Sequence, residues 1–215
     1  MKKQKKFFTV VPLQEILYNE DGSIRLNKLT SGHYQPVGNS RLEYWDTRFP
    51  IIPVLHGYAE PEDLIQVVAI TPDNPFAAYH LEELRQEVEQ VASEKGLLHC
   101  QFCPVSIPDA GDVNTQIDLF QKLLDYVQSD DLLYGCLTYG TKPMTVAELM
   151  AIQYAYRALD NVTIDCLVYG EVKWKIKQNY IYDITALIQL DEITRMLAER
   201  RVKNPREIID GILTL

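Results

Sequence analysis

Hydrophobic and polar positions follow two alternating patterns along most of the chain. Short, continuous apolar runs predict buried strands, at 7–11, 64–70, 97–105, 132–138 and 162–169. Between them, apolar residues recur every three or four positions, which predicts amphipathic helices at 76–95, 113–127 and 145–159. Strands that alternate with helices of this length are typical of right-handed βαβ crossovers. We therefore expect an α/β fold with a mainly parallel sheet and helices on both of its faces.

Two regions depart from this rhythm. Residues 14–50 are rich in turn residues and predict an irregular insertion, with short strands at 24–29 and 41–45. The apolar run Ile51–Leu55 contains Pro53, which favours an edge strand or an extended loop. We expect a main domain over 1–173, with the insertion at about 14–50. The remainder, 174–215, is expected to be an appendage of one strand and two helices, the last of them capped by Asn204 and begun by Pro205.

The composition limits the classes of function. Hydrophobic residues make up 47% of the 215, which is enough for a sizeable core. The longest apolar runs are too short for a membrane span, and the basic start is not followed by a signal-peptide core, so a cytoplasmic location is expected. The net charge of −9 argues against a protein that coats long nucleic acids, because such binding depends on many Lys and Arg contacts. A small anionic ligand held by a few local donors remains compatible with it.

Cysteine and histidine residues do not form an evident site. Cys100 and Cys103 have the spacing of half a zinc site, but no second pair completes it. All four cysteines lie in predicted strands, which favours buried core thiols over a metal site or disulfides. His80, in the first turn of a helix, and His99, in a strand, are interpreted as structural. The other two histidines lie in loops without an evident carboxylate partner.

The strand-to-helix junctions are the most informative positions for function, because ligands of open α/β sheets bind at the carboxyl ends of the strands. Polar groups occur at all four, at 11–14, 71–74, 106–109 and 138–142. In the last, Gly140 allows close backbone approach, and Thr141, Lys142 and Thr145 lie where a helix N-terminus attracts an anion. The alternative is that Thr141 or Thr145 only caps the helix and Lys142 is solvated. The motifs of P-loops, dinucleotide-binding folds and nucleophile elbows are absent.

At this junction the chain resembles a known family. The segment Cys136-Leu-Thr-Tyr-Gly140 is similar to the Asp-x-Thr-His-Gly motif of CRISPR-associated DxTHG proteins, and Gly140-Thr-Lys-Pro-Met144 resembles the G-T-K-P-M of other CARF-superfamily members. Further resemblances follow in the family's order, at 48–50, 67–71, 168–170 and 182–185. Cys136 and Tyr139 replace the family's Asp and His, so the roles of those two residues do not carry over.

The resemblance implies a Rossmann-like CARF domain of antiviral defence. Such a domain forms a homodimer and binds a cyclic oligoadenylate across its two-fold axis, with no cofactor and no metal. Ligand-binding residues are then expected at the strand ends: Pro12, Gln14, Thr71, Asn74, Ser106, Thr138, Tyr139, Gly140, Thr141, Lys142 and Met144. Many CARF proteins carry a nuclease domain with an R-x(4–6)-H motif. That motif is absent here, so we expect a CARF domain without such an effector.

Two roles follow from the resemblance, a ring nuclease or a receptor that passes the signal to a partner. A ring nuclease would let a ribose 2′-OH attack the adjacent phosphorus, which requires positioning and charge stabilisation more than a metal. Lys142 and Thr141 are the expected catalytic residues, and Tyr139 is the only candidate base, a poor one because the usual pKa of tyrosine is near 10. A Rossmann-like enzyme acting on another nucleotide is the alternative outside the family.

Overall fold

A seven-stranded, mostly parallel sheet forms the centre of the main domain. The computed structural model describes residues 4–44, 46–173 and 178–214. In spatial order, the strands are β4 (Tyr34–Val37), β9 (Gln178–Asp183), β8 (Thr163–Lys173), β7 (Asp131–Cys136), β1 (Gln4–Val10), β5 (Leu64–Pro72) and β6 (His99–Ile107). The five strands from β8 to β6 run parallel, β9 is antiparallel to β8, and β4 is parallel to β9.

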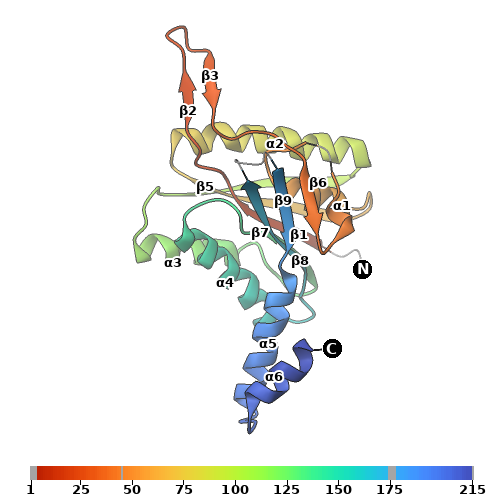
Figure 1. Ribbon diagram of the computed structural model, residues 1–215. Coiled ribbons are helices and arrows are strands. Elements are labelled where there is room, and N and C mark those ends of the chain that lie inside the picture. Colours follow the sequence, from red (N-terminus) through yellow and green to blue (C-terminus); the bar gives the residue numbers. More distant parts are fainter. Residues whose placement is uncertain (1–3, 45, 174–177, 215) are drawn as a thin grey trace. The chain divides into compact units, whose positions relative to one another are not determined.

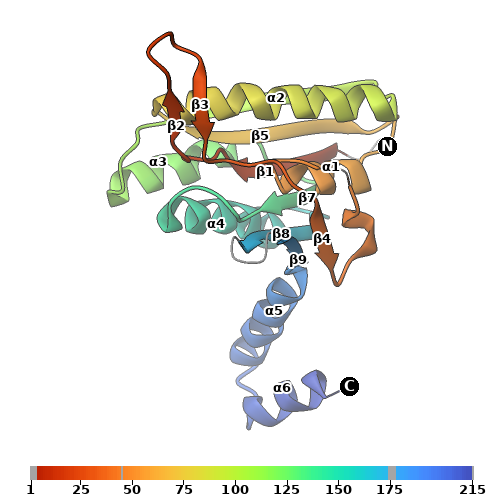
Figure 2. The ribbon, with the colours of Figure 1, turned by 45° about the horizontal axis from the view of Figure 1, so that its top comes forward.

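Helices cover both faces of this sheet (Figures 1 and 2). Helices α1 (Ile51–Tyr58) and α2 (Pro75–Lys95) lie on one face, and α3 (Val113–Leu124) and α4 (Lys142–Ala158) lie on the other. This arrangement confirms the expected α/β fold, and it is consistent with a Rossmann-like architecture. All the predicted strands and helices of the regular βαβ part are present, with ends that differ by a few residues.

Local chemistry fixes the ends of the long helix α2. The side chain of Asn74 accepts a hydrogen bond of 2.9 Å from the amide of Phe76, and Pro75 occupies the first helical position. At the other end Gly96 adopts a left-handed conformation with φ of 63°, which suits glycine because it has no Cβ. The glycine stop agrees with the predicted end of this helix, whereas the start signals at Asn74 and Pro75 were not used in the prediction, which began the helix at residue 76.

The centre of the core lies between the neighbouring strands β1 and β7. Phe7 and Tyr134 are paired in register and their rings stack with centroids 4.5 Å apart. Both side chains are almost completely buried. Strand β1 therefore lies in the interior of the sheet, with β7 on one side and β5 on the other.

The insertion at 14–50 is more ordered than expected. Strands β2 (Ile16–Tyr18) and β3 (Ile24–Asn27) form a hairpin that projects from the body (Figures 1 and 2). The predicted strand at 24–29 corresponds to β3. The predicted strand at 41–45 is wrong: Ser40–Leu42 form a 3₁₀ helix, capped by the side chain of Asn39.

Two other predictions in the main domain are corrected. Ile51–Leu55 belong to helix α1, not to an edge strand, because Pro53 lies in the first helical turn, where the missing amide proton costs no intrahelical hydrogen bond. The apolar positions of the predicted helix at 113–127 are expected to face the core, but Ile117 is 51% exposed, and the helix ends at Leu124. Leu119 and Leu123 are its buried residues.

The chain divides into two compact units, Met1–Asp183 and Ile184–Leu215. Strand β9, which we had placed in the appendage, pairs with β8 and β4 in the main sheet. The second unit consists of helices α5 (Thr185–Glu199) and α6 (Pro205–Leu213), which pack on each other. Asn204 stands at the N-cap position of α6, but its side chain makes no capping hydrogen bond, contrary to the prediction.

Candidate functional site

The switch point of the sheet lies between β1 and β7. From β1 the chain proceeds to β5 and β6 on one side, and α3 then returns it to β7 on the other side. Because β1 and β7 are parallel, the segments that follow them, at 11–15 and 137–141, leave the same edge of the sheet. In open α/β sheets this edge is where ligands bind.

A polar depression opens at this place, and we call it the switch-point hollow. It has two adjoining parts of about 320 Å³ and about 220 Å³, which share Gln14, Thr138 and Tyr139. The larger part is completed by Leu13 and Gly140, and the smaller part by Lys28, Leu29, Thr30, Gly170 and Val172. The structure therefore brings together four of the predicted ligand-binding residues: Gln14, Thr138, Tyr139 and Gly140.

The loop after β7 is held tightly against the neighbouring strands. The hydroxyl of Thr138 accepts a hydrogen bond of 2.8 Å from the amide of Gly170 on β8. Gly140 has φ of 85°, and a Cβ there would lie 2.6 Å from Cγ1 of Val10 on β1. Glycine is required at this position both by the backbone conformation and by the close approach to β1.

The N-terminus of α4 differs from those of α2 and α3. Asn74 and Asp112 cap α2 and α3 with their side chains, whereas Thr141 at the N-cap of α4 makes no such bond, and its Oγ1 is buried without a partner. The hydroxyl of Thr145 lies 3.3 Å from the carbonyl oxygen of Thr141, to which it donates, and so it does not cap the helix either. Side-chain capping by Thr141 or Thr145, the first part of the alternative interpretation, is therefore wrong. Its second part, a solvated Lys142, agrees with the exposure of that side chain. An anion at this terminus stays a prediction.

Lys142 is exposed and lies away from the lining of the switch-point hollow. It borders a groove of about 630 Å³ between α3 and α4, whose lining is mostly apolar and includes Val113, Ile117, Val146 and Met150. Within the part of the chain that the structure describes, its ammonium group has no hydrogen bond or ion pair. A free cation therefore stands beside the uncapped helix terminus.

The remaining predicted residues do not line the hollow. The hydroxyl of Thr71 donates to the carbonyl of Ala69, and the carbonyl of Ser106 accepts from Lys122. Asn74, besides capping α2, donates to Asp109 across the ends of β5 and β6. Two further residues, Pro12 and Met144, are buried.

Tyr139 anchors the loop after β7 instead of facing a ligand with its hydroxyl. Its side chain is 8% exposed, and its hydroxyl donates a hydrogen bond of 2.7 Å to the backbone carbonyl of Arg48. Burial raises the pKa of Tyr139 well above its usual value, and the neighbouring hydroxyl of Tyr34 acts in the same direction. Its hydroxyl is therefore not placed to act as a general base at neutral pH.

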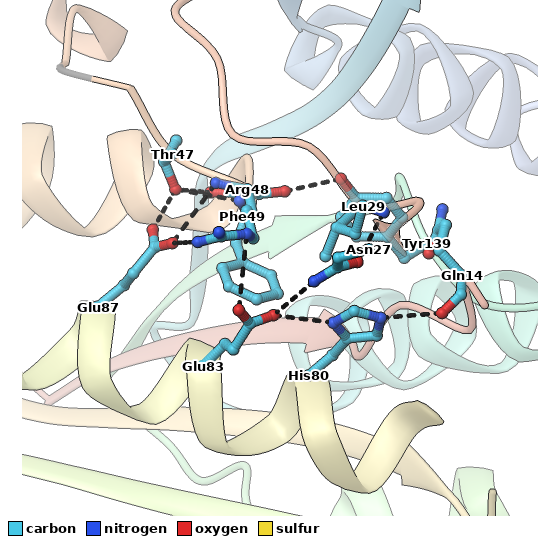
Figure 3. A network of polar contacts seen from close by, with 10 residues as sticks. All are labelled: Gln14, Asn27, Leu29, Thr47, Arg48, Phe49, His80, Glu83, Glu87 and Tyr139. Atoms are coloured by element: carbon cyan, nitrogen blue, oxygen red, sulfur yellow. Dashed lines mark hydrogen bonds and ion pairs between the residues drawn. The ribbon is translucent and has the colours of Figure 1, made fainter. Parts of the chain in front are cut away.

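A network of polar contacts supports the hollow from the side of α2 (Figure 3). The completely buried imidazole of His80 bonds the carbonyl oxygen of Gln14 at 2.9 Å and Glu83 at 3.0 Å. Glu83 also contacts Asn27 at the end of the hairpin and Arg48 beside Tyr139. The structural interpretation of His80 is thus supported: it fixes the backbone at Gln14.

A second carboxyl group extends this network along α2. Glu87 accepts hydrogen bonds from the hydroxyl of Thr47 and from the amide of Arg48, the latter at 3.5 Å. Burial raises the pKa of the Glu87 carboxyl, although these hydrogen bonds favour its charged form. Because the backbone carbonyl of Arg48 accepts the hydrogen bond from Tyr139, α2 holds the loop before α1 and, through it, the loop after β7 that lines the hollow (Figure 3).

Sequence reasoning missed six of the ten lining residues, Leu13 among them. Lys28, Leu29 and Thr30 come from the segment after the β2–β3 hairpin, and Gly170 and Val172 come from β8. The unusual length of the 14–50 segment was the one sequence signal, since long connections in compact domains are often functional. No periodicity indicates which of its residues return to the sheet.

The cysteines and the remaining histidines are distributed without forming a metal centre in the described ranges. Cys103, Cys136 and Cys166 are buried in strands and Cys100 is half-buried, as expected for core thiols. Burial raises the pKa of Cys100 to about 11. His33, for which the sequence indicated no carboxylate partner, lies 3.1 Å from Glu43.

Comparisons of the sequence with known proteins do not supply a function for this chain. No protein-family model matches this chain, and no curated protein matches it in sequence. In the part of the chain that the structure describes, no helix combines the length and the apolar character needed to cross a membrane. The function must therefore be argued from the residues at the carboxyl edge of the sheet.

Proposed function

We propose that this chain is a receptor for a cyclic oligoadenylate, a small ring of AMP units, and that it belongs among the CARF-type proteins of CRISPR systems. The observation that carries the proposal is the G-T-K-P-M segment at 140–144, of which Gly140 lines the polar switch-point hollow and Thr141 and Lys142 begin α4. A helix terminus without a side-chain cap, together with a free lysine, suits a phosphate group.

The acidic net charge of −9 is no obstacle to such a ligand. Only a few phosphates of a small ring have to be met, and a local group of donors can do so. The resemblance of segment 136–144 to CARF proteins then selects adenylate rings among the possible nucleotides.

A homodimer forms part of the proposal. The groove between α3 and α4 exposes a cluster of apolar side chains: Val113 is 67% exposed, Val146 55%, Met150 52% and Ile117 51%. Clusters of this kind mark contact surfaces in soluble proteins. Lys142 borders the same groove, so a two-fold contact there brings the lysines of both copies towards one ligand.

The dimer is tested by light scattering on the purified protein. We expect a two-fold mass at micromolar concentration, and a monomer when Ile117→Asp places a charge in the groove. A wild-type monomer would contradict the dimer. An Ile117→Asp dimer would place the contact elsewhere on the surface.

Ring cleavage is the catalytic form of the proposal. Lys142 and Thr141 would stabilise charge on the phosphoryl oxygens while the ring is held for in-line attack. A receptor without cleavage is the second candidate. Two observations favour it, because both leave cleavage without a general base. The hydroxyl of Tyr139 is bonded to the carbonyl of Arg48. Among the described residues, the lining of the hollow contains neither a histidine nor a carboxylate side chain.

One incubation separates these forms. The purified protein is mixed with cyclic tri-, tetra- and hexa-adenylate, and the products are resolved by chromatography. Conversion of one ring to linear products with 2′,3′-cyclic phosphate ends supports the nuclease, and binding of an intact ring supports the receptor. Failure to bind any of the rings contradicts both.

The lysine is tested with a matched variant. Lys142→Ala is expected to weaken ring binding about tenfold, since a charge-assisted contact to phosphate is lost. Lys203→Ala removes another exposed lysine, which lies in the second unit, and should leave binding unchanged. Equal effects of both variants would show that only net charge matters.

A further inference from the structure

We propose that Lys28 is a phosphate-binding residue of the switch-point hollow. When no ligand is bound, the carboxylate of Glu15 pairs with the ammonium group of Lys28 in place of the phosphate. This inference deepens the proposed function, on which it rests for the identity of the ligand. The ligand class it requires is a nucleotide, with a phosphate near Lys28 and the rest of the molecule against Gln14.

The position of Lys28 follows from the β2–β3 hairpin. The amide of Lys28 donates a hydrogen bond of 3.1 Å to the carbonyl oxygen of Glu15, which closes the base of the hairpin. The residues that flank this base, Gln14 before β2 and Leu29 after β3, line the hollow. Glu15 and Lys28 thus stand together at its rim.

The two side chains neutralise each other in the structure. Nζ of Lys28 lies 2.6 Å from Oε2 of Glu15, and the side chains are 51% and 45% exposed. Exposed ion pairs contribute little stability, so a competing anion can displace the carboxylate. Lys28 is the only cationic side chain that lines the hollow within the described residues.

Gln14 supplies an independent indication that a ligand fits here. Its backbone carbonyl is held by His80, which fixes the position of the residue (Figure 3). Its side-chain Oε1 is buried and has no hydrogen-bond partner. Buried acceptors without partners are uncommon in folded proteins, and a carboxamide pairs well with the donor and acceptor on the edge of adenine.

The segment at 27–30 is built to keep Lys28 in place. Asn27 accepts a hydrogen bond of 2.8 Å from the amide of Leu29 and contacts Glu83 with its own amide group. The side chain of Leu29 is 5% exposed and packs into the core. A fixed backbone with an exposed cation between two anchored residues lowers the entropy lost when a ligand binds.

The test replaces Lys28 and Glu15 in separate variants, which should change the affinity for a nucleotide in opposite directions. Binding of AMP, of inorganic phosphate and of the three adenylate rings is measured by calorimetry on the full chain. Lys28→Ala is expected to weaken AMP binding about tenfold. Glu15→Gln, which frees the lysine, is expected to strengthen it roughly twofold to fivefold.

A matched control separates this local effect from net charge. Asp118 and Lys122 form an ion pair of similar exposure, 2.9 Å long, on α3. Asp118→Asn changes the net charge by the same amount as Glu15→Gln and should leave AMP binding unchanged. Equal gains in both variants would overturn the inference, as would a loss of affinity in Glu15→Gln, which would show that the pair only closes the hairpin.

The outcomes also distinguish this inference from the proposed function. AMP binding that responds to Lys28 and Glu15 while no ring binds would support the subsite and contradict the receptor. Ring binding that is indifferent to Lys28→Ala would support the receptor and overturn the subsite. Phosphate binding as tight as AMP binding would overturn the role of Gln14, and Gln14→Leu, which should weaken AMP but not phosphate, checks it directly.

Discussion

The hydroxyl of Tyr139 donates a hydrogen bond of 2.7 Å to the backbone carbonyl of Arg48, which lies 91 residues earlier in the chain. This bond joins the loop after β7 to the loop before α1. Arg48 also faces Glu83 and Glu87 on α2, so the contact links the switch-point hollow to the polar network on that helix (Figure 3). Tyr139 is therefore a structural residue of the candidate site.

Replacing Tyr139 by Phe tests that role. The ring is retained, but the carbonyl of Arg48 loses its donor, so the free energy of unfolding should fall by about 1–2 kcal/mol. Denaturant unfolding measures it. Any ring cleavage should survive in Tyr139→Phe when the variant is assayed below its unfolding range, and a complete loss of cleavage with an intact fold would make Tyr139 catalytic.

His80 should matter for stability although it faces no ligand. His80→Phe keeps a ring of similar size but leaves the Gln14 carbonyl and Glu83 without the imidazole, and we expect a loss of roughly 3 kcal/mol in the free energy of unfolding. The matched control is His33→Phe, at a histidine whose side chain is 42% exposed, which should cost less than about 0.5 kcal/mol. Similar losses in both variants would contradict the assigned role of His80.

The regular part of the fold was predictable because its signals are local. Apolar runs, helical periodicity and stop signals such as Gly96 predict the βαβ order directly. Helix α1 was missed because Pro53 is read as a breaker unless it is known to lie in the first turn. Strand β9 was placed in the appendage because its partners, β8 and β4, are set by long-range pairing.

The candidate site was predictable only where it lies at the ends of regular elements. Thr138 to Lys142 follow a strand and start a helix, so their common location could be inferred. Lys28 comes from the segment after the β2–β3 hairpin, whose position depends on Asn27 and Leu29 contacting distant residues. Whether Lys142 turns towards the hollow or the α3–α4 groove is decided by side-chain packing, which carries no sequence pattern.

Glu148 on α4 predicts an unusual pH dependence. Its side chain is fully buried, and apart from the backbone of Cys136, which favours the charged form only weakly, nothing in the described part of the chain compensates the loss of water around its carboxyl oxygens. Burial raises the pKa of the Glu148 carboxyl well above its usual value. Below the unfolded-state pKa of about 4.3, the Glu148 carboxyl is protonated in both the folded and the unfolded state, so its ionisation does not reduce the free energy of unfolding. As the pH rises above that value, only the unfolded state releases the proton, so stability falls, by at most about 1.4 kcal/mol per pH unit, until the folded state ionises as well.

The variant Glu148→Gln removes this titration. We expect it to be more stable than the wild type at pH 8 and comparable at pH 4, in denaturant unfolding followed at both values. Glu20→Gln, on the exposed tip of the hairpin, should keep the pH slope of the wild type. A slope in Glu148→Gln equal to that of the wild type would show that the carboxyl ionises without cost in the folded protein.

Gly140 and Gly22 form a matched pair for the packing of the loop after β7. Both have positive φ, 85° and 80°, so an alanine is strained by roughly 1 kcal/mol at either position. They differ in their surroundings, because a Cβ at Gly22 meets nothing within 4 Å, whereas at Gly140 it lies 2.6 Å from Cγ1 of Val10. Gly140→Ala should therefore cost about 2 kcal/mol more in unfolding free energy than Gly22→Ala, since the loop must move away from β1. The same movement should lower ligand affinity in Gly140→Ala only. Equal costs of unfolding in the two variants would mean that the loop yields freely, and that it is not held against β1.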